Sequence, residues 1–208
     1  MRNSCLLPLI KHNYRYIDYV AISAFVERWQ PETNTFHLPF GEMMITLDDV
    51  SSILGVSVLG SCFNASWGRK EIAANNAMKL TIEELGVSEA EVVEEYDKAF
   101  SVRLDWIKKR CERHATNAST EEELYQCARG YLLYVLGCVV FPDKTKTRVS
   151  CYYLGALKDL SKVGEIAWGV AILAYTYRQL GLSSRAGVKS ITGCLTLVVV
   201  HFHHLTFR

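Results

Sequence analysis

The chain has 208 residues, of which 50% are hydrophobic and 22% are charged. A chain of this size and composition buries enough apolar surface to form one sizeable globular domain, which excludes disorder over most of its length. Its 23 basic and 22 acidic side chains nearly cancel. This balance argues against an overall polycation that binds nucleic acid through net charge.

The seven cysteines are widely spaced and include no C-x-x-C pair. An odd number without paired spacing argues against a disulfide framework and against a zinc site, so we expect a reducing intracellular compartment. The apolar runs 131–141 and 166–180 are too short or too interrupted for a helix of roughly 20 apolar residues that spans a membrane. The first apolar stretch of the chain is also too short for a secretion signal. We therefore expect neither secretion nor membrane insertion.

The first long predicted element is a helix that begins near Ile17, where apolar residues recur with helical spacing, and that ends at Pro31. Alternating apolar residues on both sides of the turn at Pro39 and Gly41 then predict one short β-hairpin near residues 35–46.

A compact helix over 47–54 follows, with Thr46 as its N-cap and Gly55 at its end. The next segment, 58–67, is rich in Ser, Gly and Asn and is predicted to be a loop. A capped helix followed by a glycine turn also opens a helix-turn-helix motif, but the loop supplies no recognition helix. We prefer the interpretation that the 47–54 helix packs against the hairpin.

Two capping boxes predict the next helices. Ser88 with Glu91 opens a long amphipathic helix that the apolar spacing continues to about Arg113. Thr120 with Glu123 opens a core helix that ends before the next proline, and this is the clearest helix in the chain.

The remaining segments are predicted as a basic loop over 143–148, a short helix over 152–160, and a helix that Ser161 caps and Gly181 ends. The β-branched run from Ile191 fits either a strand or a buried helix. The predicted fold is mainly α, a multi-helix globular domain with one short hairpin.

No motif of nucleotide-binding, hydrolase, metalloprotease or deaminase chemistry occurs, and we predict no catalytic residue, cofactor or metal. His201, His203 and His204 form the one cluster of ligand-type side chains. Their spacing does not converge on one helix face, so a structural role is favoured over a metal site.

Basic residues gather in two segments of the predicted fold. They form a phosphate-binding patch if the fold brings the two segments together, and a solvated face otherwise. The residues are Lys108, Lys109, Arg110, Arg113, Lys144, Lys146 and Arg148.

Three segments resemble the plant mobile domain family in the family's order. The first is FVERWQPETNTFHLPFGEMMITLDDVSSILGVSVLG, the second is ARGYLLYVLGCVVFPDKTKTRVSCYYLGALKDLSKVGEIAWGVAILAYTYRQL, and the third is SITGCLTL. The positions that match family motifs are expected to have structural or interface roles. They are Arg28, Trp29, Pro31, Glu32, Phe36, His37, Pro39, Gly41, Glu42, Asp143, Trp168 and Arg178.

Among these positions, Trp29 and Phe36 are expected in the core, and Pro31, Pro39 and Gly41 in turns. The four polar residues of the first motif, Arg28, Glu32, His37 and Glu42, are expected to form a network that locks the hairpin to a helix.

The resemblance implies a mainly helical, nuclear, non-enzymatic domain of the maintenance-of-meristems type. It also implies roles in transposon silencing, genome stability, gene expression and meristem maintenance. The implied partners are a serine/threonine phosphatase of the phosphatase 7 type or other mobile-domain proteins. The family also carries the label aminotransferase-like, yet no lysine here has the context of a pyridoxal-phosphate lysine, so an enzyme ranks last. A nucleic-acid or chromatin-binding module derived from a retrotransposon is the alternative hypothesis.

The resemblance divides the chain into an N-terminal extension over 1–13, a plant mobile domain over 14–197 and a divergent tail over 198–208. The family pattern usually continues past the third segment, whereas here VVVHFHHLTFR follows. We therefore expect a truncated copy of the domain.

Overall fold

The computed structural model describes residues 6–10, 18–63, 74–96, 100–117, 120–185, 187–188 and 190–206. The mainly α fold is confirmed. The α-helices are α1 (Leu7–Ile10), α2 (Tyr19–Val26), α3 (Leu47–Leu54), α4 (Ala74–Leu85), α5 (Glu89–Glu95), α6 (Leu104–Asn117), α7 (Glu121–Val135), α8 (Leu154–Leu157), α9 (Trp168–Ser183) and α10 (Leu195–Thr206). The strands are β1 (Trp29–Gln30), β2 (Thr35–Leu38), β3 (Gly41–Met43), β4 (Ser101–Arg103) and β5 (Arg148–Ser150).

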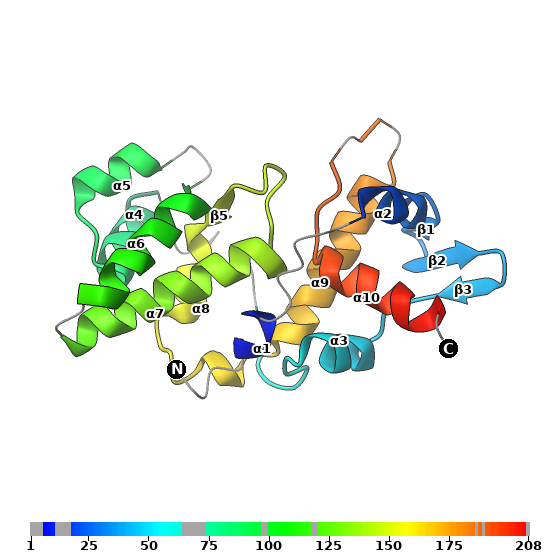
Figure 1. Ribbon diagram of the computed structural model, residues 1–208, viewed down its shortest axis with the longest axis horizontal. Coiled ribbons are helices and arrows are strands. Elements are labelled where there is room, and N and C mark those ends of the chain that lie inside the picture. Colours follow the sequence, from blue (N-terminus) through cyan, green and yellow to red (C-terminus); the bar gives the residue numbers. More distant parts are fainter. Residues whose placement is uncertain are drawn as a thin grey trace.

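The path of the chain is interleaved. Helices α4 to α8 and the antiparallel pair β4–β5 gather at one end of the molecule (Figure 1). The segments that precede and follow this middle part meet at the other end, where α2, α3, α10 and the sheet β1–β2–β3 surround α9. No described helix is both long enough and apolar enough to cross a bilayer.

The chain passes between these two ends in the segments around Ser61 and around Ile166, and we call these segments the two chain crossings. They are hydrogen-bonded to each other. Ser61 and Ile166 form an isolated parallel bridge, and the Ala167 N–H donates to the carbonyl oxygen of Ser61 at 2.9 Å. Gly60 has a φ of +134°, and a Cβ atom at this position would lie 2.2 Å from the carbonyl oxygen of Glu165. The backbone conformation and the close contact at position 60 therefore require glycine where the two crossings meet.

An aromatic cluster fills the space beside this bridge. The Phe63 ring lies 5.2 Å from that of Trp168 and 5.6 Å from that of Phe141. Phe141 stacks on Tyr153 at 4.8 Å, and the Tyr175 hydroxyl donates to the carbonyl oxygen of the residue after Phe141. The cluster joins α9 to the segments around α7 and α8.

Three helix starts agree with the sequence. Each has a capping box, in which the cap side chain accepts from the N3 backbone N–H and the N3 carboxylate accepts from the cap N–H. Gly55 ends α3 with a φ of +66°, as predicted. The boxes pair Thr46 with Asp49, Ser88 with Glu91, and Thr120 with Glu123.

The predicted end of the first helix, at Pro31, was wrong. Helix α2 stops at Val26, and Trp29 and Gln30 then form β1, so that Pro31 follows a strand and not a helix. The hairpin is confirmed in β2 and β3, and β1 extends it to three antiparallel strands.

The long helix predicted from Ser88 to Arg113 is also wrong. Helix α5 ends at Glu95, Tyr96 is extended, and Phe100 has a φ of +53° before β4 begins. Cross-strand pairing of β4 with β5 and the hydrogen bond of the part-buried Tyr96 hydroxyl with Thr81 at 2.7 Å override the helical spacing.

Later predictions had mixed outcomes. Ser161 caps no α-helix, because α9 begins at Trp168, and Gly181 lies inside α9 and not after it. The run after Ile191 resolves into α10. Helix α4 was not predicted, nor was the π-helical turn over 136–140 that extends α7.

A buried ion pair holds α4, α7 and α8 together. Arg129 Nε lies 3.2 Å from Glu84 Oε2, and both side chains are largely buried. Lys158 Nζ lies 4.0 Å from the other Glu84 oxygen, and Arg129 also contacts Glu122 at 3.1 Å. Burial raises the pKa of Glu84, and the positive charges of Arg129 and Lys158 oppose this rise.

Candidate interaction surface

The sheet β1–β2–β3 separates the motif residues by side-chain alternation. Trp29 pairs with Phe36, which pairs with Met43, so these three side chains share one face of the sheet. Their neighbours Gln30, Thr35, His37 and Glu42 belong to the opposite face.

The inner face packs against the two C-terminal helices. The Trp29 ring lies 4.8 Å from Phe36 and 5.0 Å from Tyr177 of α9, and Phe36 lies 4.9 Å from Phe202 of α10. The Tyr177 hydroxyl donates to the carbonyl oxygen of Ile45. The prediction that Trp29 and Phe36 belong to the core is confirmed.

The outer face carries a row of polar motif residues. The carbonyl oxygen of Arg28 accepts from the His37 N–H at 2.8 Å, and His37 pairs across the strands with Glu42. Arg28, His37 and Glu42 are therefore cross-strand neighbours in that order. His37 Nε2 lies 3.3 Å from Glu42 Oε1, and the two side chains are 42% and 59% exposed.

Thr35 completes the contacts on this face. Its hydroxyl donates to Glu42 Oε2 at 3.4 Å and shares a hydrogen bond with the Thr33 hydroxyl. These contacts stay within the sheet and its loop, so they do not lock the hairpin to a helix as we expected. The hydroxyl faces the carboxylate and not the imidazole, and the arrangement lacks the nucleophile-to-base bond of a catalytic triad.

The hairpin tip adds exposed apolar side chains. Pro39 and Phe40 form the turn, and Gly41 has a φ of +138°. Phe40 is 79% exposed and Met44 is 48% exposed. Phenylalanine, methionine and arginine are enriched in protein interfaces, so the outer face and the tip combine polar and apolar features of a contact surface. We call Arg28, Thr35, His37, Phe40 and Glu42 the hairpin surface.

The remaining motif residues lie apart from the hairpin surface or at its margin. Glu32 and Pro31 are exposed in the loop between β1 and β2, and Arg178 is exposed on α9. Asp143 orders the loop before β5, since its carboxylate accepts from Thr145 Oγ1 at 2.7 Å and from the Thr147 N–H at 3.3 Å.

Trp168 is fully buried, and its indole N–H donates to the carbonyl oxygen of Val163 at 2.8 Å. It therefore serves packing and not contact with a partner.

The basic residues do not form one free patch. Arg110 donates to the carbonyl oxygens of Leu85 and Gly86, and Arg148 donates to those of Glu95 and Ser101. Both guanidinium groups thus satisfy backbone acceptors inside the fold.

Most of the other basic side chains of the two segments have local partners as well. Lys108 and Lys109 pair with acidic residues on the same helix, and Lys146 donates to the Tyr19 hydroxyl at 3.0 Å. These contacts fit a solvated and internally paired face better than a phosphate-binding patch.

The histidines of α10 do not share one environment. His201 is buried, with Nδ1 3.7 Å from Asp49 Oδ1 of α3, whereas His203 is exposed. The side chain of His204 lies outside the described residues. Within the described part of the chain, no three potential ligands of the His, Cys, Asp and Glu type come together.

A family model described as plant mobile domain matches residues 8–206, and the chain belongs to this family. This confirms the resemblance of the three motif segments. The match and α10 both continue across residue 197, and the division into extension, domain and tail stays a prediction.

The chain is similar to Protein MAIN-LIKE 1 and to Protein MAINTENANCE OF MERISTEMS, both of Arabidopsis thaliana. Each is 39% identical over 178 residues, which is 85% of this chain. The chain spans about a third of the length of these relatives, 34% and 35%.

It is also similar to the Serine/threonine-protein phosphatase 7 long form homolog of the same plant, at 33% identity over 194 residues. That match covers 93% of this chain and 14% of the relative. No solved structure matches the chain.

The sequence identified three residues of the hairpin surface, Arg28, His37 and Glu42, but not their arrangement. Thr35 and Phe40 were not among the predicted site residues, and neither was Gln30, which lies on the same outer face of the sheet. Gln30 was missed because the segment before Pro31 was interpreted as helix. The alternation Arg28–Trp29–Gln30, polar–apolar–polar, was the available signal of a strand.

Proposed function

We propose that this chain is a non-enzymatic nuclear interaction domain that contacts a partner protein through the hairpin surface. The observation that carries the proposal is the row Arg28–His37–Glu42 on the outer face of the sheet, in which Arg28 and Glu42 are exposed and His37 is half-buried. Buried motif residues such as Trp29 and Trp168 are accounted for by packing. Exposed motif residues on a rigid sheet indicate binding more directly.

The proposed partner is a serine/threonine phosphatase of the phosphatase 7 type or another mobile-domain protein. A relative of this chain is named as a long form homolog of that phosphatase and contains a similar segment, which supports this choice of partner. In a complex of this kind the domain would act in transposon silencing, genome stability, gene expression and meristem maintenance.

Nucleic-acid binding is less well supported than protein binding. The guanidinium groups of Arg110 and Arg148 donate hydrogen bonds to backbone carbonyl oxygens, and the net charge of the chain is +1. An electrostatic interface with phosphates needs several free cations on one face.

A pull-down with the tagged chain from plant nuclear extract, with and without nuclease, tests the proposal. We expect mass spectrometry to recover a phosphatase 7 type protein or a mobile-domain protein in both samples. The triple variant R28A/H37A/E42A should reduce this recovery at least tenfold.

The matched control is K79A/E83A, which removes an exposed ion pair on α4 at the other end of the molecule. This control should bind like the unmodified chain. Partners that disappear after nuclease treatment would instead establish the nucleic-acid module. Equal recovery by the triple variant would show that the hairpin surface is not the contact.

A further inference from the structure

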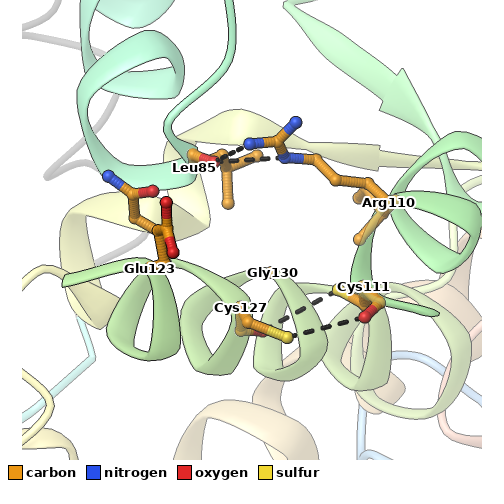
Figure 2. A pocket seen from close by; sticks show the side chains of 8 residues that line it. Leu85, Arg110, Cys111, Glu123, Cys127 and Gly130 are labelled. Carbon is orange, nitrogen blue, oxygen red and sulfur yellow. Dashed lines mark hydrogen bonds between the residues drawn. The ribbon is translucent and has the colours of Figure 1, made fainter. Parts of the chain in front are cut away.

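Two cysteines on neighbouring helices lie against each other. The Cys111 thiol of α6 donates to the carbonyl oxygen of Cys127 at 3.7 Å, and the Cys127 thiol of α7 donates to that of Cys111 at 3.7 Å. Figure 2 shows the two side chains turned toward one another between the helices. Each sulfur atom therefore lies beside the backbone of the other cysteine.

A glycine allows the helices to come this close. A Cβ atom at Gly130 would lie 3.1 Å from Cys111 Sγ and 3.6 Å from the Leu85 side chain. Gly130 is on α7, one turn after Cys127, and its missing side chain leaves room for the Cys111 sulfur. Gly130 therefore allows α6 and α7 to pack closely beside the two thiols.

A small pocket reaches this pair. Its walls include Arg110, Cys111, Glu123, Gln126 and Cys127, and it encloses about 10 Å³ (Figure 2). That is about the space that one water molecule needs. Both cysteines are half-buried, and the pocket beside them has room for a small polar molecule.

We propose that Cys111 and Cys127 form a reversible disulfide when the protein meets a peroxide. Neither cysteine has a role in the hairpin surface or in the proposed function. In a reducing compartment disulfides are transient and are typical of redox sensing, so the pair would respond to oxidant and return to two thiols with reductant.

The reaction balances with hydrogen peroxide as the oxidant. One cysteine loses its proton and its sulfur attacks a peroxide oxygen, the O–O bond breaks, and the released hydroxide takes the proton to give water. The resulting sulfenic acid is attacked by the second sulfur. The S–O bond breaks, the S–S bond forms, and the hydroxyl leaves as a second water with the proton of the second thiol. Two electrons pass from sulfur to peroxide.

Burial raises the pKa of the Cys111 thiol to about 12, and the neighbouring Cys127 thiol adds to the rise. The reaction is consequently slow at neutral pH, because the thiolate is the reactive form. We expect it to accelerate as the pH rises toward 9.

The bridge would fasten α6 to α7 across a sequence separation of 16 residues. Closing a loop of this length removes conformational entropy from the unfolded chain and should raise the thermal midpoint by roughly 5–10 °C.

Peptide mapping tests the proposal on the whole chain. The protein is treated with hydrogen peroxide, free thiols are alkylated, and trypsin cuts after Arg113 between the two cysteines. We expect a linked pair of peptides, residues 111–113 and 114–129, with a mass two hydrogens below the sum of the reduced peptides. Dithiothreitol should separate them.

Two variants and one internal control test whether the linked peptides come from a Cys111–Cys127 disulfide. C127S should abolish the linked pair and the rise in thermal midpoint, and C138S, which changes another half-buried cysteine of the same helical segment, should leave both unchanged. Exposed Cys62 reports that the oxidant acted. If Cys62 is oxidised while Cys111 and Cys127 are both recovered alkylated or bonded to other cysteines, the proposal is overturned.

Discussion

The carbonyl oxygen of Glu165 accepts two hydrogen bonds from Ser61, one from its N–H at 2.7 Å and one from its hydroxyl at 3.2 Å. These bonds hold the two chain crossings between the ends of the molecule in fixed register. Gly60 lies directly before Ser61 and permits this approach.

Replacement of Gly60 by alanine should destabilise the fold. The new Cβ atom would meet the Glu165 carbonyl oxygen at 2.2 Å, and the φ of +134° is strained for any other residue, so we expect a loss of about 2–4 kcal/mol in the free energy of unfolding. Urea denaturation measures the loss. G155A is the matched control, since the space around that helical glycine is open, and it should gain about 0.5–1 kcal/mol. If G60A is as stable as the unmodified chain, the two crossings are not tightly joined at Gly60.

Loss of Arg129 should leave the Glu84 carboxylate buried without its main partner. R129M is expected to cost about 3–5 kcal/mol at pH 7. The cost should shrink as the pH falls, because protonation of Glu84 removes the unpaired charge. Denaturation curves between pH 4 and 8 measure this trend.

The double variant E84Q/R129M should recover part of the stability that R129M loses. K158M should cost less than about 1 kcal/mol, because Lys158 is 66% exposed. A pH-independent loss in R129M would contradict the ion-pair account.

The N-cap of α3 should be a pH-dependent source of stability. Burial works to raise the pKa of Asp49, but hydrogen bonds from Thr46 and the nearby His201 outweigh it, so the pKa lies below its usual value. A lowered folded-state pKa means that the contribution is present above the unfolded value and disappears as the pH falls through the folded value. D49N should therefore cost about 0.5–1 kcal/mol at pH 7 and nothing near pH 2.

The comparison for this prediction is D48N, which alters an acidic residue in the same first turn that makes no cap bond. Its effect should be only a few tenths of a kcal/mol. If the two variants lose the same stability, the cap bonds of Asp49 contribute nothing beyond its charge.

The two faces of the hairpin sheet should differ sharply in mutational cost. W29A removes a core ring that is 2% exposed and should cost about 3–5 kcal/mol. H37A/E42Q changes a half-buried and an exposed side chain on the outer face and should stay within about 0.5 kcal/mol. Thermal and urea unfolding measure both, and a large loss for H37A/E42Q would assign these residues a structural role.

Local features of this fold were predictable because their interactions span only a few residues. The cap at Thr46, the glycine at Gly55 and the turn at Pro39 and Gly41 each depend on neighbours within four positions. The sequence therefore predicted α3 and the hairpin closely.

The break between α5 and α6 depends on distant partners. Arg148 donates to the carbonyl oxygens of Glu95 and Ser101, 53 and 47 residues earlier, and these bonds stabilise an extended backbone where the apolar spacing favours a helix. The row on the hairpin surface escaped prediction for a related reason, since it exists only because β1 pairs with β2.

The interleaved path has a consequence for how the protein is made. Tyr177 donates to the carbonyl oxygen of Ile45, 132 residues earlier in the chain. At the usual rates of translation, about 7–26 s separate the emergence of these residues from the ribosome. During that interval α4 to α8 are synthesised, while α9 and α10, whose Tyr177 and Phe202 cover Trp29 and Phe36, are not yet complete. The end of the molecule that carries the hairpin surface is thus the last to be completed. In nascent chains the apolar inner face of the sheet stays exposed until α9 and α10 are synthesised.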